Sequence, residues 1–253
     1  MKLHYRELGV GQPLIILHGL FGFSDNWQSQ AKKLAEYYRV ILIDLRNHGH
    51  SPWSEEFSYD LMAHDVFELC KELNLKEFIL VGHSMGGKVA MTFAQNHEVL
   101  VDKLVVVDIG IKQYPMHHEH ILAGIHAVDL PNISARRQAE TQISIHINSE
   151  GVKQFLLKNL YWKDKGILAW RMNVNVLERE MKTILSAIDE VVVTVPTLFI
   201  RGAMSNYILD DDIDSIEERF IDAEIVTIDN AGHWVHAEAA HDFLENLLSF
   251  CLR

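Results

Sequence analysis

The residues that could do chemistry begin with a serine between two glycines, in the run Gly82-His83-Ser84-Met85-Gly86. The pattern Gly-x-Ser-x-Gly marks a nucleophilic serine when it forms a sharp turn between a strand and a helix. Here the apolar run Phe78 to Val81 comes before it, and a helical pattern from Met85 to Asn96 follows. This context favours a nucleophile over a plain glycine-rich turn. The chemistry that it predicts is attack by the Ser84 hydroxyl on a carbonyl carbon.

A serine hydroxyl is a weak nucleophile at neutral pH, so a histidine must accept its proton and a carboxylate must orient that histidine. The loop Ala231 to Glu238 follows the last predicted strand and precedes the last helix, which is where the base belongs in a chain whose order is serine, acid, histidine. His233 fits this position best. His236 is the rival, but it falls at the start of the helix and is expected to face away from the loop.

The acid is ambiguous in the sequence. The loop Arg201 to Tyr207 follows the first β-rich run after the helical middle segment of the chain. The acid usually lies in this loop, but here the loop contains Asn206 and no carboxylate. Asp108 ends the strand Leu104 to Val107 and lies at the carboxyl edge of the predicted sheet, from which it could reach the same histidine. The alternative is the group Asp210, Asp211 and Asp212, which resembles the acidic first turn of a helix. The strand-end position favours Asp108.

An oxyanion formed by this attack needs backbone N–H donors. The helix after Ser84 directs its first amide, that of Met85, toward the same point. The second donor is expected in the loop His18 to Gly22, with Leu20 as the first choice and Phe21 as the second. His83 is next to Ser84 in sequence, but adjacent residues at such a turn point in different directions, so it is interpreted as structural.

Short β-rich runs alternate with helical patterns at both ends of the chain, which predicts a mostly parallel sheet flanked by helices. The runs Leu3 to Leu8 and Leu14 to Leu17 are expected to form a hairpin at a sheet edge. Between about 111 and 190 the β-rich runs disappear and the spacing becomes helical. The prediction is an α/β-hydrolase fold whose core consists of residues 1–110 and 191–253, with an all-helical cap, 111–190, inserted between two core strands.

Composition excludes several functional classes. The 253 residues carry 23 Lys and Arg against 35 Asp and Glu, a formal charge of −12, which disfavours nucleic acid and anionic membranes as partners. No apolar run approaches the roughly 20 residues of a spanning helix, and the N-terminus lacks a signal-peptide pattern, so a cytoplasmic location is expected. The two cysteines, Cys70 and Cys251, lie in apolar helical patterns and are interpreted as buried, inert thiols.

Five segments, spread over most of the chain, closely resemble those of the bacterial YbfF-type esterases. They are Asp44-Leu45-Arg46-Asn47-His48-Gly49-His50-Ser51, Gly82 to Lys88, Val107-Asp108-Ile109, Gly151 to Lys158 and Gly232 to Glu238. The resemblance implies a serine esterase that acts on short acyl esters, with acyl-CoA thioesters as a further substrate class. It also implies that the triad acid is Asp108. Ser205 could then support the triad by a hydrogen bond, or be a simple turn residue.

Other signals are weaker. The histidines of Met116 to His120, with His126, could suggest a metal site, but they form no closed ligand set and are interpreted as a solvated cap segment. Tyr161, Trp162 and Trp170 could line an acyl pocket or pack the cap. A small-molecule substrate is expected, with no metal and no cofactor. A carbon–carbon bond hydrolase or a perhydrolase on the same triad stays open, as does a non-catalytic ligand receptor.

Overall fold

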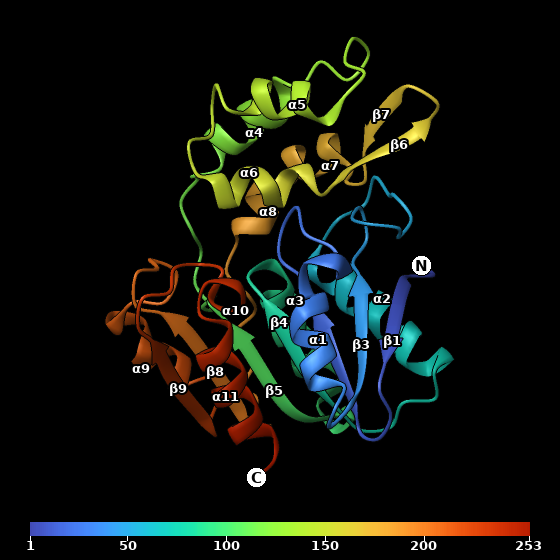
Figure 1. Cartoon of the computed structure of the whole chain (residues 1–253). Coiled ribbons are helices and arrows are strands. Elements are labelled where there is room, and N and C mark those ends of the chain that lie inside the picture. The colour runs from blue at the N-terminus through green and yellow to red at the C-terminus, as the bar shows by residue number, and fades with distance from the viewer.

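A seven-stranded sheet forms the centre of the protein, in a computed structural model that describes all 253 residues (Figure 1). The strands are β1 (His4–Leu8), β2 (Pro13–Leu17), β3 (Arg39–Asp44), β4 (Phe78–His83), β5 (Val101–Val107), β8 (Thr197–Gly202) and β9 (Ala223–Ile228). Their order across the sheet is β1-β3-β2-β4-β5-β8-β9, and every pair except β1 with β3 is parallel. The predicted α/β-hydrolase fold with a mostly parallel sheet is thus confirmed.

Helices cover both faces of this sheet, because its strands are apolar on both faces. The core helices are α1 (Gln28–Leu34), α2 (Tyr59–Glu72), α3 (Met85–His97), α9 (Ile213–Glu217), α10 (Val235–Glu238) and α11 (Ala240–Cys251), with the short 3-10 turns η1 (Ser24–Trp27), η2 (Glu98–Leu100) and η3 (Asp210–Asp212). Leu14 and Ile16 pack with α1 and α11, whereas Ile15 and Leu17 pack with α2 and α3. None of the helices is long and apolar enough to cross a membrane.

The first strand departs from the prediction. β1 pairs antiparallel with β3, with His4 opposite Asp44, and not with its neighbour in sequence, β2. The segment Gly9 to Gln12 therefore carries the chain across β3 instead of closing a hairpin, and both Gly9 and Gly11 take positive φ there. The alternating pattern of residues 3–8 identified an edge strand correctly. It could not identify the partner, because β-propensity holds no information about pairing.

An insertion of about ninety residues separates β5 from β8 and lies above the carboxyl edge of the sheet in Figure 1. Its helices are α4 (Glu119–His126), α5 (Arg136–Ile143), α6 (Glu150–Leu157), α7 (Val174–Arg179) and α8 (Met181–Leu185). The prediction of an all-helical insertion is wrong in one part, because β6 (Leu160–Asp164) and β7 (Ile167–Trp170) form an antiparallel hairpin. Gly166, at φ +77°, makes its turn.

Lys88 on α3 joins the core to both ends of this insertion. Its ammonium donates hydrogen bonds to the carbonyl oxygens of Lys112, at 3.1 Å, and of Ser186. It also lies 4.9 Å from the ring centre of Tyr114. The side chain is buried and neither hydrogen-bond acceptor is a carboxylate, so burial lowers the pKa of Lys88 to about 7. One buried lysine thus holds the entry and the exit of the insertion against α3.

Replacing Lys88 by Met should remove a pH dependence of stability. The pKa of a lysine in the unfolded chain is about 10.4, so the unfolded state binds the extra proton between about pH 7 and 10 and stability rises with pH there. Between pH 7 and pH 9, the free energy of unfolding of the wild type should increase by about 2 kcal/mol more than that of the Lys88→Met variant. Urea denaturation of both proteins at the two pH values measures this; equal gains would show that Lys88 is charged in the folded state.

Candidate active site

Ser84 occupies a strained turn between β4 and α3. Its φ is +53°, a left-handed conformation that a non-glycine residue holds only when its surroundings enforce it. A Cβ added to Gly86 would lie 2.5 Å from the carbonyl oxygens of Leu17 and His18, and one added to Gly82 would overlap the carbonyl of Gly86. The two glycines thus allow the turn to press against the loop after β2, which leaves Ser84 at the carboxyl edge of the sheet.

Three predicted residues form one hydrogen-bonded chain. The Ser84 Oγ lies 2.9 Å from His233 Nε2, and His233 Nδ1 lies 2.8 Å from Asp108 Oδ2. The Nδ1–H donates to the carboxylate, so Nε2 is free to accept the serine proton. The structure therefore gives Ser84, His233 and Asp108 the geometry of a catalytic triad.

Asp108 is held at its place by neighbouring strand ends. It is fully buried, follows β5 with φ +49°, and its Oδ1 accepts the Gly202 N–H at 3.0 Å. Ser205 donates its hydroxyl to Oδ2, the oxygen that also faces His233. Ser205 therefore contacts the acid directly, as the resemblance suggested, and restrains the carboxylate from rotating away from the imidazole.

The rival acids lie elsewhere. Asp210 pairs with Arg201 at 2.6 Å, Asp212 pairs with Lys112 and caps η3, and Asp211 is exposed. None of the three contacts His233. The carboxylates of this group hold the turn and the start of α9, in agreement with an acidic helix start.

Two further histidines support the base. His83 donates from Nε2 to the backbone carbonyl of His233 at 2.8 Å, so it fixes the loop that carries the base. His236 stacks on Trp27, with ring centres 4.0 Å apart and an interplanar angle of 7°, and makes no contact with Ser84. Burial lowers the pKa of both histidines, of His236 to about 3. They are neutral and add no competing charge beside His233.

The backbone amides around Ser84 distinguish the candidate oxyanion donors. Phe21 N–H donates to His48 Nε2 at 3.2 Å, whereas the amides of Leu20 and Met85 donate to no protein acceptor. His18 fixes the loop, because its Nε2 accepts the Leu45 N–H at 3.0 Å and its Nδ1 donates to Gly19. The two amides that the sequence favoured are therefore the open ones, and Phe21, the second choice, is occupied.

A cavity of about 280 Å³ opens in front of Ser84, here called the Ser84 cavity. Phe155 of α6, Trp234 and Tyr207 line it, and Tyr207 stacks on the His233 ring with centres 3.9 Å apart. His117, His118 and His120 also line it, and His118 is buried, so the interpretation of their segment as solvated was wrong for His118.

Side chains elsewhere in the insertion take other roles. Tyr161, Trp162 and Trp170 line neither this cavity nor the recesses beside Ser84; they belong to the β6–β7 hairpin, where Trp170 is buried and Trp162 is half exposed. His126 pairs with Glu178 at 2.8 Å. The three side chains that cluster with metal-ligand spacing, His241, Asp242 and Glu245, are exposed on α11 and line none of the spaces beside Ser84.

Sequence reasoning missed two residues that shape this site. His48 acts by occupying the Phe21 amide, and Tyr207 by covering His233 and accepting or donating a 2.7 Å hydrogen bond with His117 Nε2. Both lie in or beside recognisable motifs, but neither carries a local pattern that indicates its role. His48 contacts Phe21, which is 27 residues away in the chain, and Tyr207 contacts His117, which is 90 residues away.

Comparison with known proteins agrees with this geometry. A family model described as the alpha/beta hydrolase fold matches residues 12–240. The chain belongs to the α/β-hydrolase family. Among these hydrolases, it is 36% identical over 94% of both chains to esterase YbfF of Escherichia coli, which confirms the resemblance inferred from the sequence.

Other α/β-hydrolases are similar over the whole length. The sn-1-specific diacylglycerol lipase ABHD11 of Danio rerio is 39% identical, covering 96% of this chain and 79% of its own. A solved structure of a marine microorganism esterase superposes with a TM-score of 0.96 at 42% identity, over 99% of each chain. By this kinship the chain is a carboxylic ester hydrolase.

Exchange of Asp108 for Asn should identify the acid. An amide cannot stabilise the imidazolium and favours the wrong tautomer of His233, so kcat on p-nitrophenyl acetate should fall by about 10³- to 10⁴-fold. Asp210→Asn is the matched control and should leave kcat unchanged, because Asp210 pairs only with Arg201. A large loss in the Asp210 variant with little loss in Asp108→Asn would move the assignment to the later group.

Proposed function

We propose that the protein hydrolyses short-chain acyl esters through an acyl-enzyme on Ser84, with His233 as the base, Asp108 orienting it, and the amides of Leu20 and Met85 as the oxyanion hole. The hydrogen-bonded chain from Ser84 to Asp108 is the observation that carries this proposal. The open amides of Leu20 and Met85 support it, since both residues line one recess together with Ser84.

The reaction divides into two steps. In the first, Ser84 Oγ attacks the carbonyl carbon while His233 Nε2 takes its proton, and the carbon–oxygen bond to the alcohol breaks as the same nitrogen returns the proton to the leaving oxygen. In the second, water attacks the acyl carbon while His233 takes its proton; the bond from that carbon to Ser84 Oγ then breaks, His233 returns the proton to Oγ, and the carboxylic acid leaves. Ser205 acts through Asp108 and is a positioning residue.

The preference for short acyl groups is supported by a small recess beside the open amides, here called the Lys88 recess. Its volume is about 20 Å³, little more than the space that one water needs, and Met85, Ile109, Ile184, Leu185 and the Lys88 stem line it. These apolar walls favour a few methyl or methylene groups.

Two other ester classes compete with short esters. Acyl-CoA thioesters react by the same attack and are the second candidate. The net charge of −12 disfavours their polyphosphate group. The relatives named as diacylglycerol lipases make glycerolipids the third class. A panel of p-nitrophenyl esters, acyl-CoA thioesters and diacylglycerol separates the three.

Ser84→Ala should abolish hydrolysis of p-nitrophenyl acetate, because without Oγ no acyl-enzyme forms; the expected loss in kcat is about 10⁶-fold. The wild type should react with a fluorophosphonate probe at one site, identified as Ser84 by mass spectrometry, and the variant should not. A wild type that binds esters but is not labelled would instead be a ligand receptor.

Activity should fall as the acyl chain grows beyond butyrate. Leu185→Ala enlarges the Lys88 recess, so it should raise the ratio of kcat/KM for the octanoate ester to that for the acetate ester by about tenfold. The same series measured on Trp162→Ala, an exposed hairpin residue, gives the control. A steady rise of wild-type activity up to sixteen carbons would contradict the short-acyl preference.

A further inference from the structure

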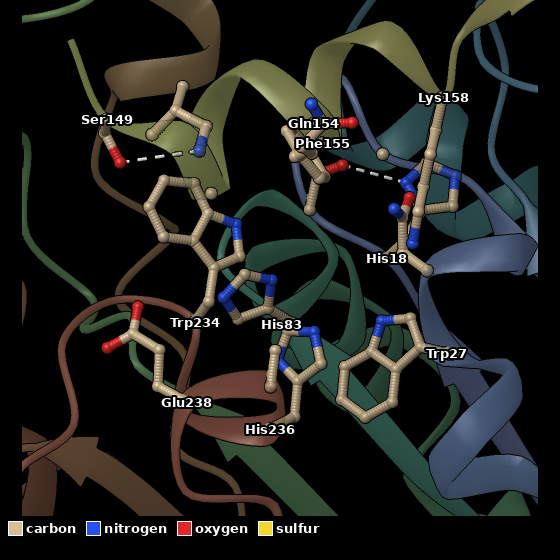
Figure 2. Close-up of a pocket in the computed structure, with 16 residues that line it drawn as sticks. His18, Trp27, His83, Ser149, Gln154, Phe155, Lys158, Trp234, His236 and Glu238 are labelled. Carbon is tan, nitrogen blue, oxygen red and sulfur yellow. Dashed lines mark hydrogen bonds between the residues drawn. The ribbon is translucent and has the colours of Figure 1, made fainter.

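A second chamber (Figure 2) shares Phe155 and Trp234 with the Ser84 cavity. This space, here called the Trp27 chamber, has a volume of about 300 Å³. Phe155, Trp234 and His83 line both spaces, but Ser84 lines only the first. A molecule whose carbonyl lies at Ser84 can therefore place another of its groups in the Trp27 chamber, provided that the molecule extends past Phe155 and Trp234.

Proton transfer decides which half of an ester this chamber faces. The leaving oxygen must receive a proton from His233, so the alcohol half lies on the side of the histidine loop. Trp234, His236 and Glu238 of that loop line the Trp27 chamber. No residue of the loop lines the Lys88 recess, which holds the open amides instead. By their lining residues, the chamber is on the side of the histidine loop and the recess is on the side of the open amides.

Six of the sixteen residues that line the chamber carry rings, three of them aromatic and three imidazole. The stacked pair Trp27 and His236 lies at its base, and Phe155 and Trp234, with ring centres 5.9 Å apart, form the wall toward Ser84. Figure 2 shows these rings surrounding the space together with His83. Such surfaces favour a flat ring, through offset or edge contacts.

Charge is confined to the rim. Lys158 and Glu238 are both exposed and of opposite sign, and Figure 2 draws them at opposite ends of the chamber. Burial lowers the pKa values of the histidines along the chamber, His18, His83 and His236, so the interior is neutral. An uncharged group is therefore favoured over an anionic or cationic one.

We propose that the Trp27 chamber is the subsite for the leaving alcohol and that it selects esters of uncharged, planar aromatic alcohols. This inference rests on the proposed serine mechanism and adds the alcohol specificity to it. Since the alcohol departs when the acyl-enzyme forms, the chamber affects acylation only. Deacylation, in which water attacks the acyl group on Ser84, proceeds with the chamber vacated.

Gly151 offers a way to fill the chamber. It lies in the first turn of α6 and lines the chamber, and an added Cβ would meet only the Ser149 hydroxyl, at 4.0 Å. Gly151→Phe should therefore occupy the space without a clash. Gly151→Ala is the matched control, because it removes the glycine from the helix without filling the chamber.

The test uses two esters with the same acyl group, 2-naphthyl acetate and ethyl acetate. Steady-state kcat/KM reports acylation, and the rate that follows the pre-steady-state burst with the naphthyl ester reports deacylation. Relative to Gly151→Ala, Gly151→Phe should lower kcat/KM for 2-naphthyl acetate by about tenfold or more. It should leave kcat/KM for ethyl acetate and the deacylation rate within about twofold, which also shows that the variant is folded.

Three results would overturn the inference: an equal loss for both esters, a loss confined to deacylation, or no change for either. The second would make the chamber an acyl site. Failure of the mechanism itself is distinguishable, because a wild type that shows no acyl-enzyme burst and no hydrolysis of either ester would refute the proposed function before any Gly151 variant is compared.

Discussion

The active-site edge depends on the close approach of backbone segments at a few glycines. At Gly86, the start of α3 lies against the carbonyls that end β2, so there is no room for a side chain. At Gly202, the end of β8 lies equally close to the carbonyls of Ala231 and Gly232, and a Cβ there would overlap them. The first contact brings the Ser84 turn to the loop of Leu20. The second brings the strand end beside Asp108 to the loop of His233. Together they bring Ser84 and His233, 149 positions apart in the chain, within hydrogen-bond distance.

Buried neutral histidines hold these loops in place. His18 and His48, with ring centres 5.1 Å apart, bind backbone groups of the loop after β2 and of the segment after β3. His83 binds the carbonyl of His233. Burial lowers the pKa values of all three, so each can donate from one ring nitrogen while the other remains an acceptor. His18 and His48 each hydrogen-bond through both ring nitrogens, so imidazole serves there as a two-ended structural link.

The insertion adds the walls that an open sheet edge lacks. α6 supplies Phe155 to both spaces beside the triad, and α8 supplies Leu185 to the Lys88 recess. Lys88 fastens the two ends of the insertion to α3, the helix that begins at the nucleophile. The triad residues therefore lie in the core, whereas the insertion supplies walls of the spaces beside them.

The sequence by itself identified Ser84 and His233 as site candidates, their order in the chain and the parallel core, because these signals are local: a glycine pattern at a strand end, a histidine before the last helix, and alternating βα runs. It favoured Asp108 but could not exclude Asp210 to Asp212, since all are acids after a strand. Only the tertiary structure distinguished these acids, because the Asp108 carboxylate accepts hydrogen bonds from Gly202 and Ser205 and faces His233. The partner of β1, the β6–β7 hairpin, the role of His48 and the two spaces divided by Phe155 and Trp234 were also decided there. Each depends on contacts between distant residues, and local propensity does not encode such contacts.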